Sequence, residues 1–173
     1  MIHYVSSKNA RIMFVGINPH YGSYRRGIPF SNNKMFWYLL NRAGIISENA
    51  DTLRNDVGLK RIYRNKFLQV YNLNFTNIIT RPSRDVSQLK RGEEDNGRKR
   101  ILRSISANKP NVVCFIGKIT YSKFIGNNDF KFGWQDDIYG SKVYVMHFPI
   151  RGKAQVRIRE LKEVNRVAMH AKK

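Results

Sequence analysis

Several features that are common in proteins are missing from this chain of 173 residues. It has one cysteine, Cys114, so it cannot form an internal disulfide or a cysteine metal cluster. Because Cys114 sits in the apolar run NVVCFIG, we expect it in the core. No apolar run approaches the roughly 18 residues of a membrane span, and residues 1–13 lack the order of a signal peptide. We therefore expect a soluble, intracellular protein with no membrane partner.

Familiar catalytic motifs are missing as well. The sequence contains no GxGxxG, GxxxxGK[ST], HExxH or GxSxG pattern, and its 4 histidines are scattered. We therefore expect no metal and no cofactor. No repeat, low-complexity tract or linker interrupts the chain, so residues 1–173 are predicted to form a single domain.

Acidic residues are scarce. The 12 Asp and Glu residues face 32 Lys and Arg residues, which gives a net charge of +20. Such a charge favours a polyanion, because each phosphate that the protein neutralises releases counterions. The basic residues are spread over most of the chain rather than gathered in one amphipathic helix, which favours nucleic acid over an anionic membrane.

The apolar pattern predicts an α/β fold. Four short apolar runs, rich in β-branched or aromatic residues, are predicted strands at 11–16, 74–80, 111–117 and 142–148. Helical spacing or end signals predict helices at 33–45, 93–110 and 154–173. Strands separated by helices imply a three-layer α/β/α sandwich around a mainly parallel four-stranded sheet. The polar stretch Ser47–Arg64 is predicted to be a long surface loop without chemistry.

Two stretches should meet at one edge of this sheet. GINPH follows the first strand and HFPIRGKAQ follows the last, and ligands of open parallel sheets bind outside the carboxyl ends of the strands. Taken alone, GINPH indicates a tight turn, because Gly16 permits unusual dihedrals and Asn18-Pro19 is a common turn pair. Two further stretches bear on its meaning: RRGIPF can present Phe30 on a loop, and NFTNIITRPS ends a strand with Asn77.

In this order and at these separations the stretches resemble the mismatch-specific uracil-DNA glycosylase and thymine-DNA glycosylase family, within the uracil-DNA glycosylase superfamily. The family's first motif is G-I-N-P-G, where this sequence has GINPH. GIPF, FTNIITRP, VVCFIGKITYSKF, FGWQ and VYVM also resemble their family counterparts, so the resemblance covers nearly the whole chain.

The resemblance implies a base-binding pocket. Asn18 matches the asparagine that positions the attacking water, and the backbone N–H groups around Ile17 and Phe30 match the donors for the leaving base. The Phe30 ring is the expected stacking partner, Ser23 a pocket wall and Asn77 a base contact. Two alternatives remain open, namely that Phe30 anchors a loop on the core and that Asn77 caps a strand end.

The second motif departs from the family, which has a small, serine-rich turn followed by a leucine or arginine wedge. One register of HFPIRGKAQ puts Gly152 at the wedge position. A register shifted by one puts Arg151 there and His147 where other branches carry a catalytic histidine, and we prefer it because glycine cannot fill a vacated stack. A strand-end cap remains the alternative for His147. Other DNA contacts are expected from His20, Tyr21, Arg25, Arg26 and Lys153, although residues 21–26 could also form a solvated surface loop.

The function implied is that of a monofunctional DNA glycosylase in base excision repair. It would flip uracil out of double-stranded DNA, best from G·U mismatches, and leave an abasic site. We expect a monomer. The alternatives are another lesion (thymine, hypoxanthine or ethenocytosine) and a non-catalytic DNA-binding module of the same fold.

Overall fold

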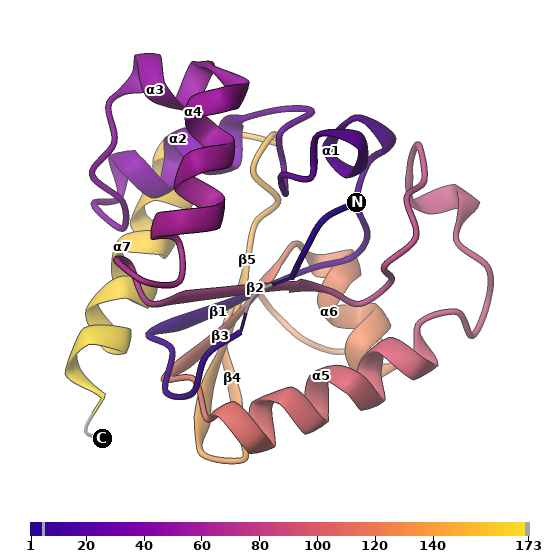
Figure 1. Ribbon diagram of the computed structural model, residues 1–173. Helices are drawn as coiled ribbons and strands as arrows, with labels where there is room; N and C mark the ends of the chain where they lie inside the picture. Colours follow the sequence, from indigo (N-terminus) through magenta and orange to yellow (C-terminus); the bar gives the residue numbers. More distant parts are fainter. Residues whose placement is uncertain (5, 172–173) are drawn as a thin grey trace.

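A five-stranded sheet forms the middle of the computed structural model, which describes residues 1–4 and 6–171 (Figure 1). Its strands are β1 (Ile12–Gly16), β2 (Leu73–Asn77), β3 (Val112–Ile116), β4 (Gly133–Ile138) and β5 (Ser141–Met146). They are ordered β2-β1-β3-β5-β4, and only the β4–β5 pair is antiparallel among them. The chain passes from β1 to β2 on one side and returns to β3 on the other, so strand order reverses beside β1, where open α/β sheets bind ligands.

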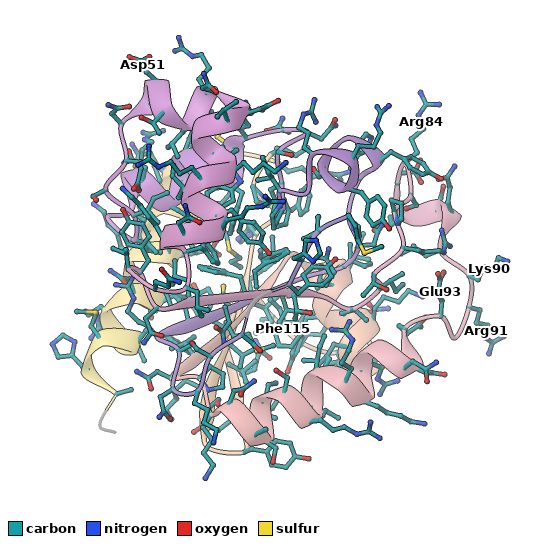
Figure 2. The ribbon with its side chains drawn as sticks, viewed as in Figure 1. Asp51, Arg84, Lys90, Arg91, Glu93 and Phe115 are labelled. Atoms are coloured by element: carbon teal, nitrogen blue, oxygen red, sulfur yellow. The ribbon has the colours of Figure 1, made fainter. Side chains whose placement is uncertain are left out.

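Helices cover both faces of the sheet, which confirms the predicted α/β architecture (Figure 1). Successive strand residues alternate between two cores, since Phe14 and Cys114 pack on one face while Val15 and Phe115 pack on the other. The first face is covered by α2 (Met35–Arg42) and α7 (Ala154–His170), and the second by α5 (Asp95–Asn108) and α6 (Lys118–Ile125). Figure 2 shows Phe115 at the centre of the molecule.

The predicted strands and helices are confirmed within a few residues at each end. The predicted helix 154–173 is observed as α7, and positions 172–173 lie outside the described residues. Cys114 is fully buried as predicted, and burial raises the pKa of its thiol well above the ordinary value. α6 and the short helix α1 (Tyr21–Arg26) had no predicted counterpart, and α1 replaces the surface loop considered for that segment.

The prediction of four strands is wrong, because β4 adds a fifth strand at the edge of the sheet. No residue of β4 is fully buried, and its sequence GWQDDI contains no apolar run. The strand pairs antiparallel with β5, and the dipeptide Tyr139-Gly140 connects the two strands. The φ angles of this dipeptide, 50° and 84°, are both left-handed. Such a two-residue turn matches the twist of a hairpin. The turn and the pairing with β5 therefore stabilise β4 as a strand, and no apolar run in its sequence indicates it.

The prediction that Ser47–Arg64 is a loop is also wrong. The segment contains the α-helices α3 (Ala50–Arg54) and α4 (Asp56–Arg61) and the start of the π-helix η1 (Ile62–Lys66). Asn49 and Asn55 cap the two helices, since Asn49 Oδ1 accepts from Thr52 N and Asn55 Oδ1 from Val57 N. Leu53 and Leu59 are fully buried. The few apolar residues lie among charged ones and the helices are short, so the helical period is hard to recognise.

No helix in residues 1–4 and 6–171 is long and apolar enough to cross a membrane. In the same residues, no group of three His, Cys, Asp or Glu side chains is arranged to hold a metal ion.

Candidate active site

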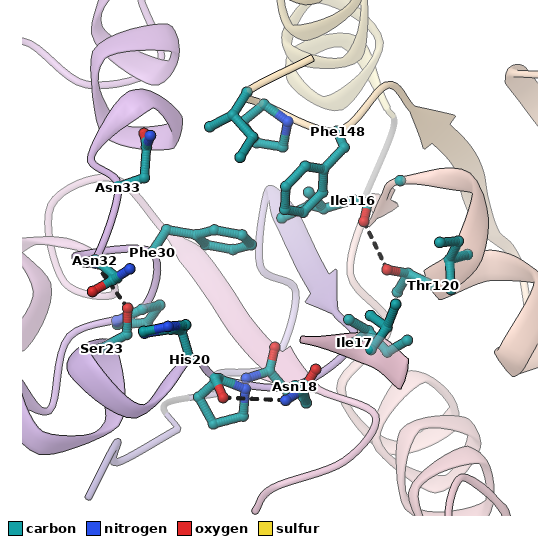
Figure 3. Close-up of a pocket in the computed structure, with 18 of the residues that line it drawn as sticks. Ile17, Asn18, His20, Ser23, Phe30, Asn32, Asn33, Ile116, Thr120 and Phe148 are labelled. Carbon is teal, nitrogen blue, oxygen red and sulfur yellow. Dashed lines mark hydrogen bonds between the residues drawn. The ribbon is translucent and has the colours of Figure 1, made fainter. Parts of the chain in front are cut away.

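A cavity of about 560 Å³ lies at the carboxyl edge of the sheet, beside the point where strand order reverses (Figure 3). Its walls come from the segments that follow β1, β3 and β5, from the end of β2, and from α1 with the loop after it. The predicted site residues that line it are Ile17, Asn18, His20, Ser23, Phe30, Asn77, His147 and Arg151. The fold therefore brings together side chains that are up to 134 positions apart in the sequence (17 to 151).

The amide of Asn18 has a defined orientation. Its Nδ2 donates to the backbone O of Pro19 at 3.1 Å and to Ser83 Oγ at 2.7 Å. A carbonyl can only accept, and Ser83 Oγ uses its own hydrogen to donate to Asp85 O at 2.7 Å. Both neighbours therefore require the amide nitrogen on their side. Asn18 Oδ1 accepts no hydrogen bond from the described residues and remains an acceptor for another molecule.

Phe30 forms an aromatic wall of the cavity. Its φ of 53° is left-handed, which is uncommon for a bulky residue and is held by its surroundings. The ring packs 4.6 Å from that of Phe36 and 5.7 Å from that of Phe75, measured between centroids, while Phe148 lies 6.4 Å away. In the close-up of Figure 3, Phe148 lies above the Phe30 ring and Asn18 lies below it. Phe30 thus both packs on the core and lines the cavity, so the two roles considered for it are compatible.

His20, which departs from the family motif, caps helix α1. Its Nδ1 accepts from Gly22 N at 3.1 Å, so in this arrangement the ring hydrogen is on Nε2. Ser23, in the first turn of the helix, is buried and its Oγ accepts from Asn32 N at 2.9 Å. The cap and this bond fix α1 and the loop before α2 against the cavity.

Asn77 ends β2 beside Gly16, its register partner on β1. A Cβ at position 16 would collide with Asn77 Oδ1, so glycine is needed there for the asparagine side chain to fit. Arg100 of α5 donates to the backbone O of Asn77 at 2.6 Å and of Ile78 at 3.2 Å. These contacts fix the backbone on which Asn77 faces the cavity.

His147 follows β5 and forms a pair with Glu160 of α7. The Nδ1 atom of His147 lies 2.7 Å from Glu160 Oε1, and its backbone N–H donates to Glu160 Oε2 at 3.1 Å. The imidazole stacks on Phe132, with 3.6 Å between the ring centroids. Because Glu160 occupies Nδ1, Nε2 is the ring nitrogen that is left for a ligand in the cavity.

Arg157 of α7 shapes the loop that carries the second motif. Its guanidinium is buried and donates to three backbone carbonyls, those of Phe148 at 3.0 Å, Pro149 at 3.2 Å and Lys153 at 2.6 Å. Gly152 has a left-handed φ of 73°, and a Cβ there would lie 3.5 Å from Arg157. Gly152 therefore serves the turn over Arg157. Arg151, by contrast, is exposed and lines the cavity.

The remaining predicted DNA contacts lie outside the cavity lining. Tyr21 is 49% exposed, and Arg25, Gly152 and Lys153 are also exposed. Arg26 forms an ion pair with Asp56 at 3.0 Å. Figure 2 shows a further set of exposed basic side chains on the loop after β2, where Arg84, Lys90 and Arg91 point outward.

Sequence reasoning missed several residues of this site. The missed residues whose contacts are described above are Ser83, Phe132, Phe148 and Glu160. Ser83 could have been suspected, because it ends the quoted stretch NFTNIITRPS. Phe148 lies in the quoted stretch HFPIRGKAQ and Phe132 opens the quoted stretch FGWQ, but neither was assigned a role, and Glu160 lies in α7 outside any quoted stretch.

The family model described as "Uracil DNA glycosylase superfamily" matches residues 2–162. A protein of Schizosaccharomyces pombe named "G/U mismatch-specific uracil DNA glycosylase" is 27% identical to this chain over 157 residues. The match covers 85% of this chain and 46% of the relative, so the chain spans about half the length of the curated relative that it matches.

Proposed function

The chain belongs to the uracil DNA glycosylase superfamily, and on this premise we propose that it is a monofunctional DNA glycosylase acting on double-stranded DNA. It hydrolyses the N-glycosidic bond of uracil and leaves an abasic site. The name of the fission-yeast relative supports a G·U mismatch as the preferred substrate. The charge of +20 supports a polyanionic substrate.

Base recognition follows from the cavity. A base inside a duplex cannot be reached, so the nucleotide is flipped into the pocket and stacked there. Phe30 supplies the stacking face, supported from behind by Phe36 and Phe75. Asn77 contacts the polar edge of the base, and Ser23 forms part of the wall. Stacking and edge contacts together recover part of the energy lost when the base leaves the duplex.

The reaction is the attack of a water molecule on the deoxyribose C1′. Asn18 Oδ1 accepts a hydrogen bond from this water and positions it. An amide is a poor base, so bond breaking runs ahead of attack and the sugar becomes a strong electrophile. The uracil leaves as an anion, which the backbone N–H groups of Ile17 and Phe30 stabilise as hydrogen-bond donors. His147, held by Glu160, adds a polar contact through Nε2.

Contacts to the DNA backbone and to the vacated stack come from the rim. Arg151 is the proposed wedge, since it lines the cavity and is exposed. Gly152 serves the turn instead. His20, Tyr21, Arg25, Arg26 and Lys153 are the proposed contacts to the strand and its phosphates.

The observation that carries the proposal is the orientation of Asn18. Its nitrogen is held by two acceptors, Pro19 O and Ser83 Oγ, so its oxygen is left as an acceptor at the cavity. Lys118 lines the cavity with its Nζ 5.6 Å from the ring centroid of Phe130, and the proposed reaction gives this lysine no covalent role.

The test is an assay on oligonucleotide duplexes that carry uracil, thymine, hypoxanthine or ethenocytosine opposite G or A. Each duplex is incubated with the protein, and half of the sample is then treated with alkali. We expect alkali-dependent strand breaks, fastest for uracil opposite G. Breaks without alkali would contradict a monofunctional enzyme. Tight DNA binding without release of any base would make the chain a DNA-binding module and refute the proposal.

One observation favours a broader lesion range as the second candidate. The cavity of about 560 Å³ is in the range that accommodates drug-sized ligands, so a bicyclic base such as hypoxanthine or ethenocytosine also fits by volume. Faster release of either of these bases than of uracil in the same assay would select this alternative.

A further inference from the structure

A tyrosine near the N-terminus contacts the base-reading asparagine. The Nδ2 atom of Asn77 donates to Tyr4 Oη at 2.9 Å, although the two residues are 73 positions apart. Asn77 is buried, 2% exposed, and lines the cavity. Its Oδ1 accepts no hydrogen bond from the described residues. The amide therefore has its nitrogen engaged and its oxygen available.

The orientation of this amide matters, because a hydroxyl can donate as well as accept and Tyr4 alone would tolerate a flipped amide. The contact with Gly16 decides which of the two amide orientations is adopted. Asn77 Oδ1 faces the side of Gly16 where a Cβ would be, and that direction carries a Cα–H. A polarised Cα–H is a weak donor that suits an oxygen, whereas an NH₂ group there would set hydrogens against hydrogens.

Tyr4 is itself firmly held. Its ring packs on Phe75 at 6.0 Å between centroids. Burial raises its pKa to about 12, although the hydrogen bond with Asn77 acts in the opposite direction, so the phenol is neutral at physiological pH. The two residues before Tyr4 are also held in place. Ile2 is 4% exposed and lines the cavity, and Tyr63 Oη donates to His3 O at 2.8 Å.

We propose that Tyr4 is a positioning residue that, together with Gly16, holds the Asn77 amide with Nδ2 engaged and Oδ1 left to accept from a base, so that the pocket prefers bases with an N–H at ring position 3, as in uracil and thymine, over cytosine. An amide oxygen accepts from that N–H and repels the unprotonated N3 of cytosine. The inference rests on the proposed function, because it names a determinant of specificity at the same site. Tyr4 touches no base and acts through Asn77.

Removing the hydroxyl frees the amide. In Tyr4→Phe the ring still packs on Phe75, but Asn77 Nδ2 loses its acceptor. The amide is then held only by its weak contact with the Gly16 Cα–H, so it is no longer fixed and presents its nitrogen, which suits the N3 acceptor of cytosine, for more of the time. Since one neutral hydrogen bond anchors the amide, we expect the ratio of uracil-type to cytosine-type excision to fall by roughly three- to tenfold.

The test uses 5-fluorouracil and 5-fluorocytosine, each placed opposite G in the same duplex. Fluorine makes both bases better leaving groups, so slow excision becomes measurable for both. Single-turnover rates are compared for the wild type, Tyr4→Phe and the control Tyr63→Phe. The control removes a hydroxyl that anchors the same segment at His3 but does not touch Asn77. A purely structural role for the segment would lower both rates alike in both variants.

We expect the rate ratio to fall in Tyr4→Phe and to stay unchanged in Tyr63→Phe. An unchanged ratio in Tyr4→Phe, or an equal change in both variants, overturns the inference while the proposed function stands. A wild type that excises neither base refutes the proposed function.

A second measurement does not depend on turnover. Solvent exchange of the Asn77 side-chain amide protons, assigned by their absence in Asn77→Asp, should be roughly three- to tenfold faster in Tyr4→Phe. Exchange that is as slow as in the wild type overturns the inference even if the protein has no activity.

Discussion

Ser83 offers a sensitive probe of how the amide of Asn18, the proposed catalytic residue, is held. In Ser83→Ala, Asn18 Nδ2 loses the acceptor at 2.7 Å and keeps only Pro19 O at 3.1 Å. A neutral hydrogen bond contributes about 0.5–1.5 kcal/mol. If that energy holds the amide in its productive orientation, excision slows by roughly two- to twelvefold, because about 1.4 kcal/mol corresponds to a factor of ten. DNA affinity should not change, since Ser83 is buried.

The assay is single-turnover release of uracil from a G·U duplex at saturating protein. The matched control is Ser104→Ala on α5, which removes a serine acceptor of the same kind, from Asn108 Nδ2 at 3.1 Å, far from the cavity. We expect the control to retain the wild-type rate. An unchanged rate in Ser83→Ala, or an equal loss in both variants, would refute the view that Ser83 orients Asn18.

Two further predictions concern the rim and the stability of the fold. Arg151→Ala should slow excision from duplex DNA by about tenfold and from single-stranded DNA much less, because only a duplex has a stack to refill. If both rates fell equally and recovered at lower salt concentration, Arg151 would instead be a phosphate contact. Glu48→Gln should lower the free energy of unfolding at pH 7 by about 1–2 kcal/mol, because the buried carboxylate accepts from Lys66 Nζ at 2.8 Å and from Tyr71 Oη at 2.5 Å. Burial raises the pKa of Glu48, but these hydrogen bonds outweigh it and hold the pKa below its ordinary value of 4.5. The stabilisation is therefore present above pH 4.5 and lost as pH falls through the folded value, so urea unfolding at pH 3 should show a smaller difference, and an equal difference at both pH values would contradict this.

The central strands were predictable because each is a short apolar run that is buried on both faces of a parallel sheet. β1 and β3 have every residue buried, so their sequences carry the whole signal. The sequence of β4 shows no such apolar run, since the strand depends on the Tyr139-Gly140 turn and on its pairing with β5. The helices in 50–66 were missed for a related reason, because short helices show less than two clear periods.

The site was predictable as far as its residues follow recognisable stretches. Asn18 and Phe30 stand in such stretches, and both line the cavity. The residues that orient the two asparagines were not identified, because Ser83 reaches Asn18 across 65 positions and Tyr4 reaches Asn77 across 73. No local pattern encodes contacts at such separations. The contact of Ser83 with Asn18 follows from the parallel pairing of β1 with β2, because the segments after the two strands run side by side as far as the bridge between His20 and Ser83.

The central claim is that Asn18 positions the attacking water, and one comparison tests it directly. Single-turnover release of uracil from a G·U duplex is measured for the wild type and Asn18→Ala, together with the affinity of each for the same DNA. We predict that the variant loses at least about 100-fold in rate, because the water is no longer positioned. Its affinity should stay within about twofold of the wild type, because phosphate contacts dominate binding. A near-normal rate in Asn18→Ala would contradict the account.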